Sequence, residues 1–292
     1  MAVSTPLVSI VTPSYNQAAF LEDTLWSVQR QTYSNLEHVV IDDGSTDGSV
    51  DILERFKAPR SLRWWSQPNA GQSAAINRGF QLAEGEIVAW LNSDDAYLSP
   101  IVVEEAVAAL QHRPAVDVVY GDHALITDTG LIFRIVPARR RISLRRLASY
   151  CPGQPSMFMR REVVRRFPLR GDLRYRMDYE YWMRLCQEGI QFAYVPQLWS
   201  AFRVHAGSNT VAATAASYRE MRDVQHRYFN GSQMVRWPME PLIRRWLGVW
   251  LRLRGFARIP QLYGVPLAFT GRRPPVGMLC LQQLMSKTFQ YV

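Results

Sequence analysis

Two adjacent carboxylates, Asp94 and Asp95, follow the apolar run at residues 87–91. Neighbouring carboxylates repel each other unless a cation, a ligand rich in hydrogen-bond donors or open solvent relieves the repulsion. Carboxylate oxygens bind the hard cations Mg²⁺ and Mn²⁺, which also bridge phosphate oxygens. The pair therefore predicts a site for a divalent ion and a phosphorylated ligand.

Other residue types suited to nucleotide chemistry occur at comparable positions. Tyr15 follows the first apolar run of the chain, and Asp43 follows the second. An aromatic ring can stack on a nucleobase, and a carboxylate can accept a hydrogen bond from a base or a ribose. Asp178 stands at the start of a predicted helix, where a carboxylate can act as a general base. Together these residues predict group transfer from a nucleoside diphosphate.

Alternating strands and helices would position these residues. Apolar runs and amphipathic segments predict strands at residues 7–12, 36–41, 63–65 and 87–91, and helices at 18–31, 49–56, 72–83 and 102–111. This alternation is typical of an α/β domain with a mostly parallel sheet. Ligands of such sheets bind outside the carboxyl ends of the strands, where PSYN, DDGS and NSDD all lie.

The second half of the chain has a less regular pattern. We expect a strand at residues 116–122 and then a hairpin with its turn at 128–130. Helices are expected from about Arg161 and within residues 174–189, and a strand with a polar loop within 194–210. Gly189 is the predicted stop of the second helix.

The excess positive charge lies in the last quarter of the chain. The 292 residues include 34 Lys and Arg and 25 Asp and Glu, a formal net charge of +9. Residues 217–292 hold twelve of the basic residues and three of the acidic ones, so residues 1–216 are neutral overall. We therefore expect a globular domain at residues 1–216 and a basic helical extension at 217–292.

The compartment is predicted from three absences in the sequence. MAVSTPLVSIVTP has no basic start, so we expect no signal peptide. No run reaches the roughly 18 to 20 apolar residues of a spanning helix. The three cysteines are odd in number and far apart, which suits a reducing cytoplasm.

Residues 242–258 form an amphipathic pattern at helical spacing. Their apolar arc includes Trp246 and Trp250, and five arginines lie outside it. We favour an interfacial helix on an anionic membrane, because so much positive charge is unneeded for covering a neutral domain. The protein would then be peripheral at the inner face of the membrane. Docking on its own domain, on an anionic glycan or on a partner protein are the alternatives.

Six segments together resemble a known enzyme family: VSIVTPSYNQ, VVIDDGSTDGS, NAGQSAAINRGF, WLNSDDAY, GQPSMFMRREV and MDYEYWMRL. They occur in order between about residues 7 and 210 and resemble the family 2 glycosyltransferases. That resemblance implies the GT-A fold, a single Rossmann-like domain with a mostly parallel central sheet. It also implies inverting transfer of one sugar from a nucleotide-diphospho-sugar to a glycan or lipid-linked acceptor.

The resemblance also assigns roles on the donor side. The residues implied to bind the nucleotide are Pro13, Tyr15, Asp43, Gly71, Asn77 and Asp94. Asp95 is implied to ligate Mn²⁺ or Mg²⁺, and His205 to reach the metal or the diphosphate. The resemblance favours a UDP-sugar as the donor, with GDP- and dTDP-sugars as alternatives.

On the acceptor side, the resemblance makes Asp178 the catalytic base. Its place at a helix N-terminus predicts that the charged form is favoured. The family often has Glu immediately before this residue, and here it is Met177. Glu180 is expected to orient Asp178 or to pair with Arg184. Gln154, Pro155, Glu180 and Trp182 are the acceptor candidates, with Trp182 a core residue in the alternative interpretation.

Other functions fit the sequence less well. The sequence lacks a QxxRW motif and membrane-spanning segments, and this argues against a processive synthase. A sugar nucleotidyltransferase should carry a glycine-rich basic loop after the first strand, and PSYNQAAF is neither. A catalytically inactive relative that binds nucleotide sugars or scaffolds partners stays an alternative because of Met177. No nucleic acid is expected, because no recognisable binding module accompanies the basic tail.

Overall fold

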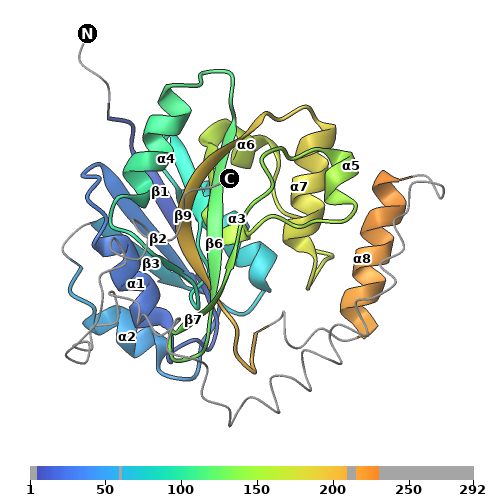
Figure 1. Ribbon diagram of the computed structural model, residues 1–292. Coiled ribbons are helices and arrows are strands. Elements are labelled where there is room, and N and C mark those ends of the chain that lie inside the picture. Colours follow the sequence, from blue (N-terminus) through green and yellow to red (C-terminus); the bar gives the residue numbers. More distant parts are fainter. Residues whose placement is uncertain (1–4, 59–60, 209–214, 230–292) are drawn as a thin grey trace.

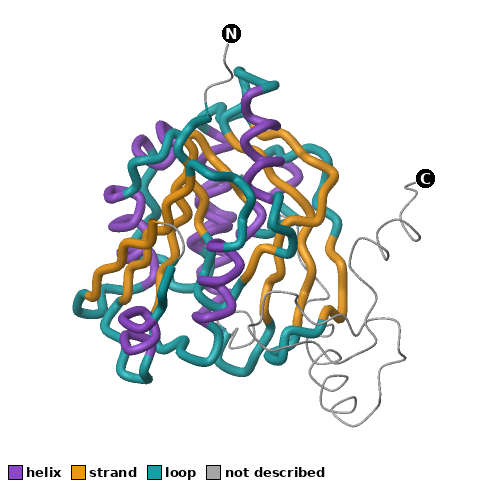
Figure 2. The backbone as a smooth tube through the Cα atoms, turned by 90° about the vertical axis from the view of Figure 1, so that its left-hand side faces the viewer, coloured by secondary structure: helices purple, strands orange, loops and turns teal. Residues whose placement is uncertain are grey.

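The computed structural model describes residues 5–58, 61–208 and 215–229. Within these residues one nine-stranded sheet has helices on both faces (Figures 1 and 2). The strands are β1 (Val8–Ser14), β2 (Leu36–Asp42), β3 (Ser61–Ser66), β4 (Ile87–Trp90), β5 (Ala96–Tyr97), β6 (Val118–Ile126), β7 (Ile132–Val136), β8 (Met157–Arg160) and β9 (Phe192–Arg203). The helices are α1 (Leu21–Gln29), α2 (Ser49–Arg55), α3 (Gln72–Leu82), α4 (Val102–Gln111), α5 (Leu144–Leu147), a 3₁₀ turn (Gln154–Ser156), α6 (Arg161–Arg166), α7 (Met177–Gln187) and α8 (Ala215–Tyr228).

The first four long strands form the parallel part of the sheet. Their order is β3-β2-β1-β4, and each neighbouring pair runs parallel. Because helices follow β1, β2 and β3, each chain return crosses a face of the sheet and restores the strand direction. The predicted α/β architecture is confirmed, and the carboxyl ends of β1, β2 and β4 lie at one edge.

Alternate side chains of β1 enter two different cores. Val11 packs in the cluster that contains the α3 residues Ala75 and Ile76, whereas Ile10 packs with α4 residues. This alternation is the period of two that a strand imposes. Gly79 lets α3 approach β1 closely, since a Cβ atom there would lie 2.2 Å from a Val11 methyl carbon.

The second half adds antiparallel strands to the sheet. β8 pairs antiparallel with β4 and β6, and β9 runs parallel to β6. The expected strand and the first arm of the expected hairpin form one continuous strand, β6. The second arm is β7, which pairs antiparallel with β6. The pairing of β6 with β9 shifts register around Asp122, which explains how one strand passes through the polar stretch that we predicted to be a break.

Helix α8 lies outside α7 at the edge of the molecule (Figure 1). Met221 and Val224 of α8 are buried in the same core cluster as Tyr179 of α7. The predicted division between residues 216 and 217 falls inside this helix, so the start of the extension packs on the preceding domain. The amphipathic stretch at 242–258 lies outside the described residues. Among the helices described, none is both long and apolar enough to cross a membrane.

Candidate active site

A cleft of about 770 Å³ lies at the carboxyl ends of β1, β2 and β4. Its walls come from the strand ends, the N-terminus of α3, the start of α7 and the loop before it, and residues 207–208. The predicted site residues that line it are Pro13, Tyr15, Asp43, Gly71, Asp94, Gln154 and Asp178. The fold therefore brings both halves of the predicted site, donor and acceptor, to one cleft.

Asp43 organises the loop that leads into α3. Its carboxylate accepts hydrogen bonds from Gln67 Nε2 at 2.9 Å, from Gly71 N at 2.9 Å and from Ala70 N at 3.1 Å. Gly71 has φ +91°, a conformation that glycine adopts without strain. Asp43 thus shapes the wall of the cleft, although it is only 2% exposed and both of its carboxylate oxygens accept hydrogen bonds from this loop. Tyr15 stands at the rim with 48% of its surface exposed, available to stack on a planar ligand.

The adjacent carboxylates Asp94 and Asp95 have opposite surroundings. Asp94 lines the cleft, and its Oδ2 lies 3.1 Å from His205 Nε2. Asp95 is 1% exposed, and its Oδ1 accepts a hydrogen bond from the Arg203 backbone at 3.0 Å. Burial, followed by the charge of Asp94, raises the pKa of Asp95 well above its usual value. The protonated form of Asp95 is therefore favoured relative to an exposed aspartate.

This arrangement changes the expected metal ligand. Asp95 was expected to hold the ion, but it lies behind the cleft and its oxygens face Arg203 N and the Asn92 amide. Asp94 and His205 instead place a carboxylate oxygen and an imidazole nitrogen side by side. In the part of the chain that the structure describes, no group of three or more His, Cys, Asp or Glu side chains has the spacing to hold a metal ion. Asp94 and His205 are thus two side chains that could ligate an ion at this point of the cleft wall.

Asn92 connects three sides of the cleft, a role that the sequence did not predict. Its Oδ1 accepts from Trp90 Nε1 at 2.7 Å and from Gln72 Nε2 at 3.0 Å. Its Nδ2 donates to Gln154 Oε1 at 3.2 Å, and Gln154 Nε2 donates to the Trp90 carbonyl. These bonds fix the N-terminus of α3 and the 3₁₀ turn against the end of β4. The position of Asn92 beside the acidic pair was the available signal.

Asp178 lies in the first turn of α7 and lines the acceptor side of the cleft. Its Oδ1 accepts from Tyr179 N at 2.7 Å, and its Oδ2 lies 3.9 Å from Cys151 Sγ. Burial raises the pKa of Asp178, and this outweighs the lowering by the Tyr179 amide and by Arg176. The expectation that the helix terminus would favour the charged form is wrong, because desolvation dominates. A raised pKa makes the carboxylate a stronger base.

Three predicted acceptor residues do not reach the cleft. Glu180 is fully buried, where its Oε1 accepts from Arg184 Nε at 3.1 Å and from Tyr228 OH at 2.6 Å. The predicted pairing of Glu180 with Arg184 is thus confirmed, and its acceptor role is corrected. Trp182 is fully buried in the core, which confirms its alternative assignment. Pro155 is buried within the 3₁₀ turn and does not line the cleft.

Asn77 is also absent from the cleft lining. Its amide forms a pair of hydrogen bonds with the backbone of Leu169, at 2.9 Å to the carbonyl and 2.8 Å from the N–H. Both ends of the amide are therefore engaged in holding the segment after α6. We remove Asn77 from the nucleotide candidates.

The loop at residues 171–175 forms a cleft wall that the sequence did not reveal. This loop has no acidic pair or glycine pattern like those at the strand ends. It reaches the cleft because it leads directly into α7, whose first turn also lines the cleft. Arg174 and Tyr175 of this loop line the cleft next to Asp178. They offer a cation and an aromatic ring to whatever binds on the acceptor side.

A comparison with known families identifies the family of this chain. The family model described as "Glycosyl transferase family 2" matches residues 9–167, more than half of the chain. The chain belongs to glycosyl transferase family 2. The match covers β1 to α6, and with them the donor-side residues of the cleft.

Several curated family 2 relatives are similar over part of their length. The glycosyltransferase TuaG of Bacillus subtilis, named for teichuronic acid biosynthesis, is 40% identical over 94 residues, 32% of this chain and 37% of that protein. A Nostoc glycosyltransferase without an assigned role, alr2836, is 37% identical over 115 residues, 39% of this chain and 35% of that protein. The matched part thus spans little more than a third of the length of these relatives.

Solved structures support the GT-A type of fold at low sequence identity. TarS of S. aureus in complex with UDP-GlcNAc superposes with a TM-score of 0.63 at 19% identity, covering 86% of this chain and 74% of that one. The mannosyltransferase PcManGT of Pyrobaculum calidifontis, in complex with GDP-Man and Mn²⁺, gives 0.59 at 18% identity, covering 87% and 76%. At these identities the likeness concerns the fold alone.

Proposed function

We propose that the chain transfers one sugar from a nucleotide-diphospho-sugar to a hydroxyl of a glycan or lipid-linked acceptor, by direct displacement with inversion. The single observation that carries the proposal is the shared cleft, in which Asp43, Asp94 and Asp178 come from separate loops to one wall system. A protein that only binds the donor would need Asp43 and Asp94. The partly buried Asp178, which comes from α7, suits a general base in addition.

The donor end of the cleft suits a nucleoside diphosphate. Tyr15 at the rim would stack on the base, and the Asp43 carboxylate, which lines the cleft, would accept a hydrogen bond from it. The fold likeness to proteins that bind UDP-GlcNAc and GDP-Man supports a sugar nucleotide and leaves its base and sugar open.

We propose that Asp94 and His205 hold a divalent ion, Mn²⁺ or Mg²⁺, against the diphosphate. The donor set fits, because the Asp94 carboxylate lines the cleft with 17% of its side chain exposed and lies 3.1 Å from the His205 imidazole. Carboxylates suit both ions, and the cleft leaves room for phosphate oxygens. When bound, such an ion would neutralise charge that develops on the departing diphosphate. Asp95 supports the site from behind by fixing the backbone of Arg203.

Asp178 is proposed as the general base. It would take the proton of the acceptor hydroxyl as that oxygen attacks the anomeric carbon from the face opposite the diphosphate. Its Oδ1 is held by the Tyr179 amide, and its Oδ2 has, among the described residues, only the Cys151 thiol, 3.9 Å away, as a partner. General-base catalysis typically contributes about 10²- to 10⁴-fold to a rate.

The first experiment screens UDP-, GDP- and dTDP-sugars for thermal stabilisation and for nucleotide release with Mn²⁺ or Mg²⁺. We expect one sugar nucleotide to stabilise the wild type. Slow transfer of its sugar to water should release the nucleoside diphosphate. Asp178→Asn should lower the rate by about 10²- to 10⁴-fold and leave the thermal shift by the donor intact. The matched control is Asp51→Asn, an exposed carboxylate of α2 that does not line the cleft. Donor binding without release by the wild type would instead identify an inactive relative.

We further propose that residues 242–258 attach the protein to anionic membranes, as their arginines and tryptophans and the +9 charge support. In the full chain, Gln would replace the five arginines Arg244, Arg245, Arg252, Arg254 and Arg258. The control replaces five exposed arginines elsewhere, Arg139, Arg140, Arg141, Arg145 and Arg146. Co-sedimentation with phosphatidylglycerol vesicles should fall for the first variant and persist for the second. Equal sedimentation of both variants would contradict this attachment.

A further inference from the structure

We propose that Glu220 of α8 is a positioning residue for Asp178, acting through the backbone that leads into α7. This inference rests on the proposed function, because it concerns the base of that reaction. Glu220 Oε2 accepts hydrogen bonds from Tyr175 N at 2.7 Å and Arg176 N at 3.1 Å. Its Oε1 accepts from Arg174 N at 3.0 Å. One carboxylate therefore binds three consecutive N–H groups.

The entrance to α7 needs such a partner. No side chain of its own caps the helix at Arg176, the residue before Met177. Unpaired N–H groups at a helix start are normally satisfied by a nearby side-chain oxygen. Here the acceptor comes from a helix more than forty residues further along the chain. Asp178 is only two residues beyond the last N–H that Glu220 holds.

The same contact fixes a wall of the cleft. Arg174 and Tyr175 line the cleft, and their backbone amides are two of the three that Glu220 binds. Arg227 of α8 adds a second tie to this loop, with its guanidinium 3.4 Å from Asp172 Oδ2. A helix outside the catalytic cleft therefore sets the position of both the base and the surface on which an acceptor would lie.

Further contacts hold α8 in place, so loss of Glu220 should not release the helix. Met221 and Val224 are buried against α7, and Gln225 Nε2 donates to the Ala148 carbonyl at 3.2 Å. Tyr228 OH donates to Glu180 Oε1 at 2.6 Å. Removal of the Glu220 carboxylate should consequently loosen residues 174–176 and leave the packing of α8 intact.

The test compares Glu220→Ala and Glu220→Gln with Asp223→Ala, which removes an exposed carboxylate from the same helix. Hydrogen exchange of the amides at 174–176 should be about tenfold faster in Glu220→Ala than in the wild type. Asp223→Ala should leave this exchange unchanged. Glu220→Gln keeps one oxygen acceptor and should lie between the two. Unchanged exchange in Glu220→Ala would overturn the capping contact.

Activity provides the second measurement, using UDP-GlcNAc and GDP-Man with Mn²⁺ at a temperature well below unfolding of every variant. Glu220→Ala should lower kcat for nucleotide release by about 10- to 100-fold, the loss that a base misplaced by about 1 Å produces. The donor KM should stay at the wild-type value, because the donor-side residues are untouched. A kcat equal to that of Asp223→Ala would overturn the positioning role. If the wild type released no nucleotide, the proposed function would fail by itself, and the exchange measurement would still decide whether Glu220 holds the loop.

Discussion

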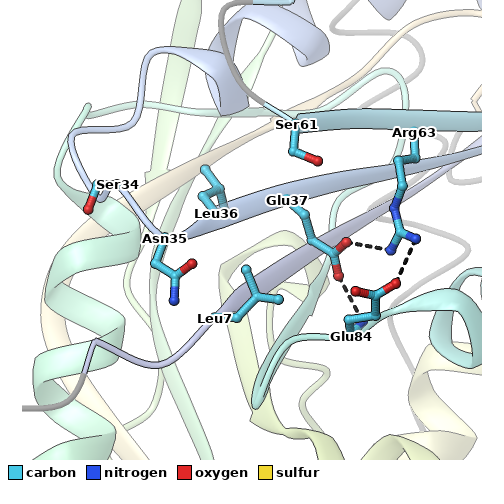
Figure 3. A pocket seen from close by; sticks show the side chains of 8 residues that line it. All are labelled: Leu7, Ser34, Asn35, Leu36, Glu37, Ser61, Arg63 and Glu84. Atoms are coloured by element: carbon cyan, nitrogen blue, oxygen red, sulfur yellow. Dashed lines mark hydrogen bonds and ion pairs between the residues drawn. The ribbon is translucent and has the colours of Figure 1, made fainter.

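The two ends of the parallel strands treat their carboxylates differently. At the amino end, Glu37 accepts from the Arg63 guanidinium at 2.5 Å, from Ser9 Oγ at 2.5 Å and from Glu84 N at 2.8 Å. Arg63 also pairs with the Glu84 carboxylate at 2.8 Å (Figure 3). Glu37 and Glu84 thus share one positive partner, the Arg63 guanidinium.

At the carboxyl end, acidic residues have hydrogen-bond partners such as Arg203 N and Tyr179 N, and three of them differ from Glu37 in their charge partners. In the described ranges, no Lys or Arg forms an ion pair with Asp94, Asp95 or Asp178. Desolvation raises the pKa values of Asp95 and Asp178. The same kind of side chain is therefore ion-paired at one edge, whereas burial disfavours its charged form at the other.

This difference separates structural from functional carboxylates. Paired acids contribute to stability and have no capacity left for a ligand. Acids that lack a protein cation lower the stability of the empty protein, and such groups cluster where a substrate or an ion will supply the missing charge. The comparison can be tested by substitutions at each end.

The largest effect should come from the carboxylate that faces the cleft. Asp94→Asn should raise the Mn²⁺ concentration for half-maximal nucleotide release by about 10- to 100-fold, because the amide is a weaker ligand beside His205. Asp95→Asn, its neighbour, should change this concentration little, since a buried acid with a raised pKa already resembles its amide. Titration with Mn²⁺ measures both. A larger effect of Asp95→Asn than of Asp94→Asn would identify Asp95, and not Asp94, as the metal ligand.

At the amino end, the expected effect is on stability instead of turnover. Glu37→Gln should lower the free energy of unfolding by about 1 to 3 kcal/mol, because the Arg63 guanidinium loses its charged acceptor at a site where Glu37 is 6% exposed. Urea unfolding measures this loss. Nucleotide release below the unfolding temperature should be unchanged. Glu54→Gln, at an exposed position, is the control and should alter neither quantity.

The pH dependence of turnover should report the raised pKa of Asp178. Only the deprotonated form can accept a proton, so kcat should fall as the pH falls through the folded-state pKa of this group. That value lies above the ordinary 3.8 of an aspartate. A pH–rate profile should therefore show an acidic limb with its midpoint above pH 3.8. A midpoint below 3.8 would mean that donors, and not desolvation, dominate the surroundings of the base.

The smallest effect should be a gain in stability on removing the same charge. Because the folded pKa of Asp178 is raised, its ionisation lowers stability as the pH rises through that value. Asp178→Asn should thus raise the Tm at neutral pH by about 2 to 4 °C. The gain should disappear below the unfolded-state pKa, where the wild-type residue is neutral too. A lower Tm of the variant at pH 7 would show that Asp178 is stabilised and not strained.

Much of the donor side was predictable from the sequence. The predicted strands at 36–41 and 87–91 match β2 and β4 within a residue, and the helix at 102–111 matches α4. Asp43, Gly71 and Asp94 lie in the cleft as expected. These successes share a cause, since the end of a strand and the residues after it are fixed by local patterns.

The acceptor side was less predictable. Glu180 and Trp182 are on the predicted helix, but its rotation buries both, and only Asp178 of the three lines the cleft. Periodicity defines which residues share a helix face, and it does not define which face meets the cleft. The role of Glu220 left no local signal either, because its partners precede it by more than forty residues.

The sequence by itself determined the α/β order of the first half and the gathering of PSYN, DDGS and NSDD at one edge, because parallel strands present their carboxyl ends together. Only the tertiary structure decided which of two adjacent aspartates faces the cleft. That choice depends on Arg203, whose N–H reaches Asp95 from 108 positions along the chain. The tertiary structure also decided the proton affinity of Asp178, because desolvation depends on all of the elements packed around a group together.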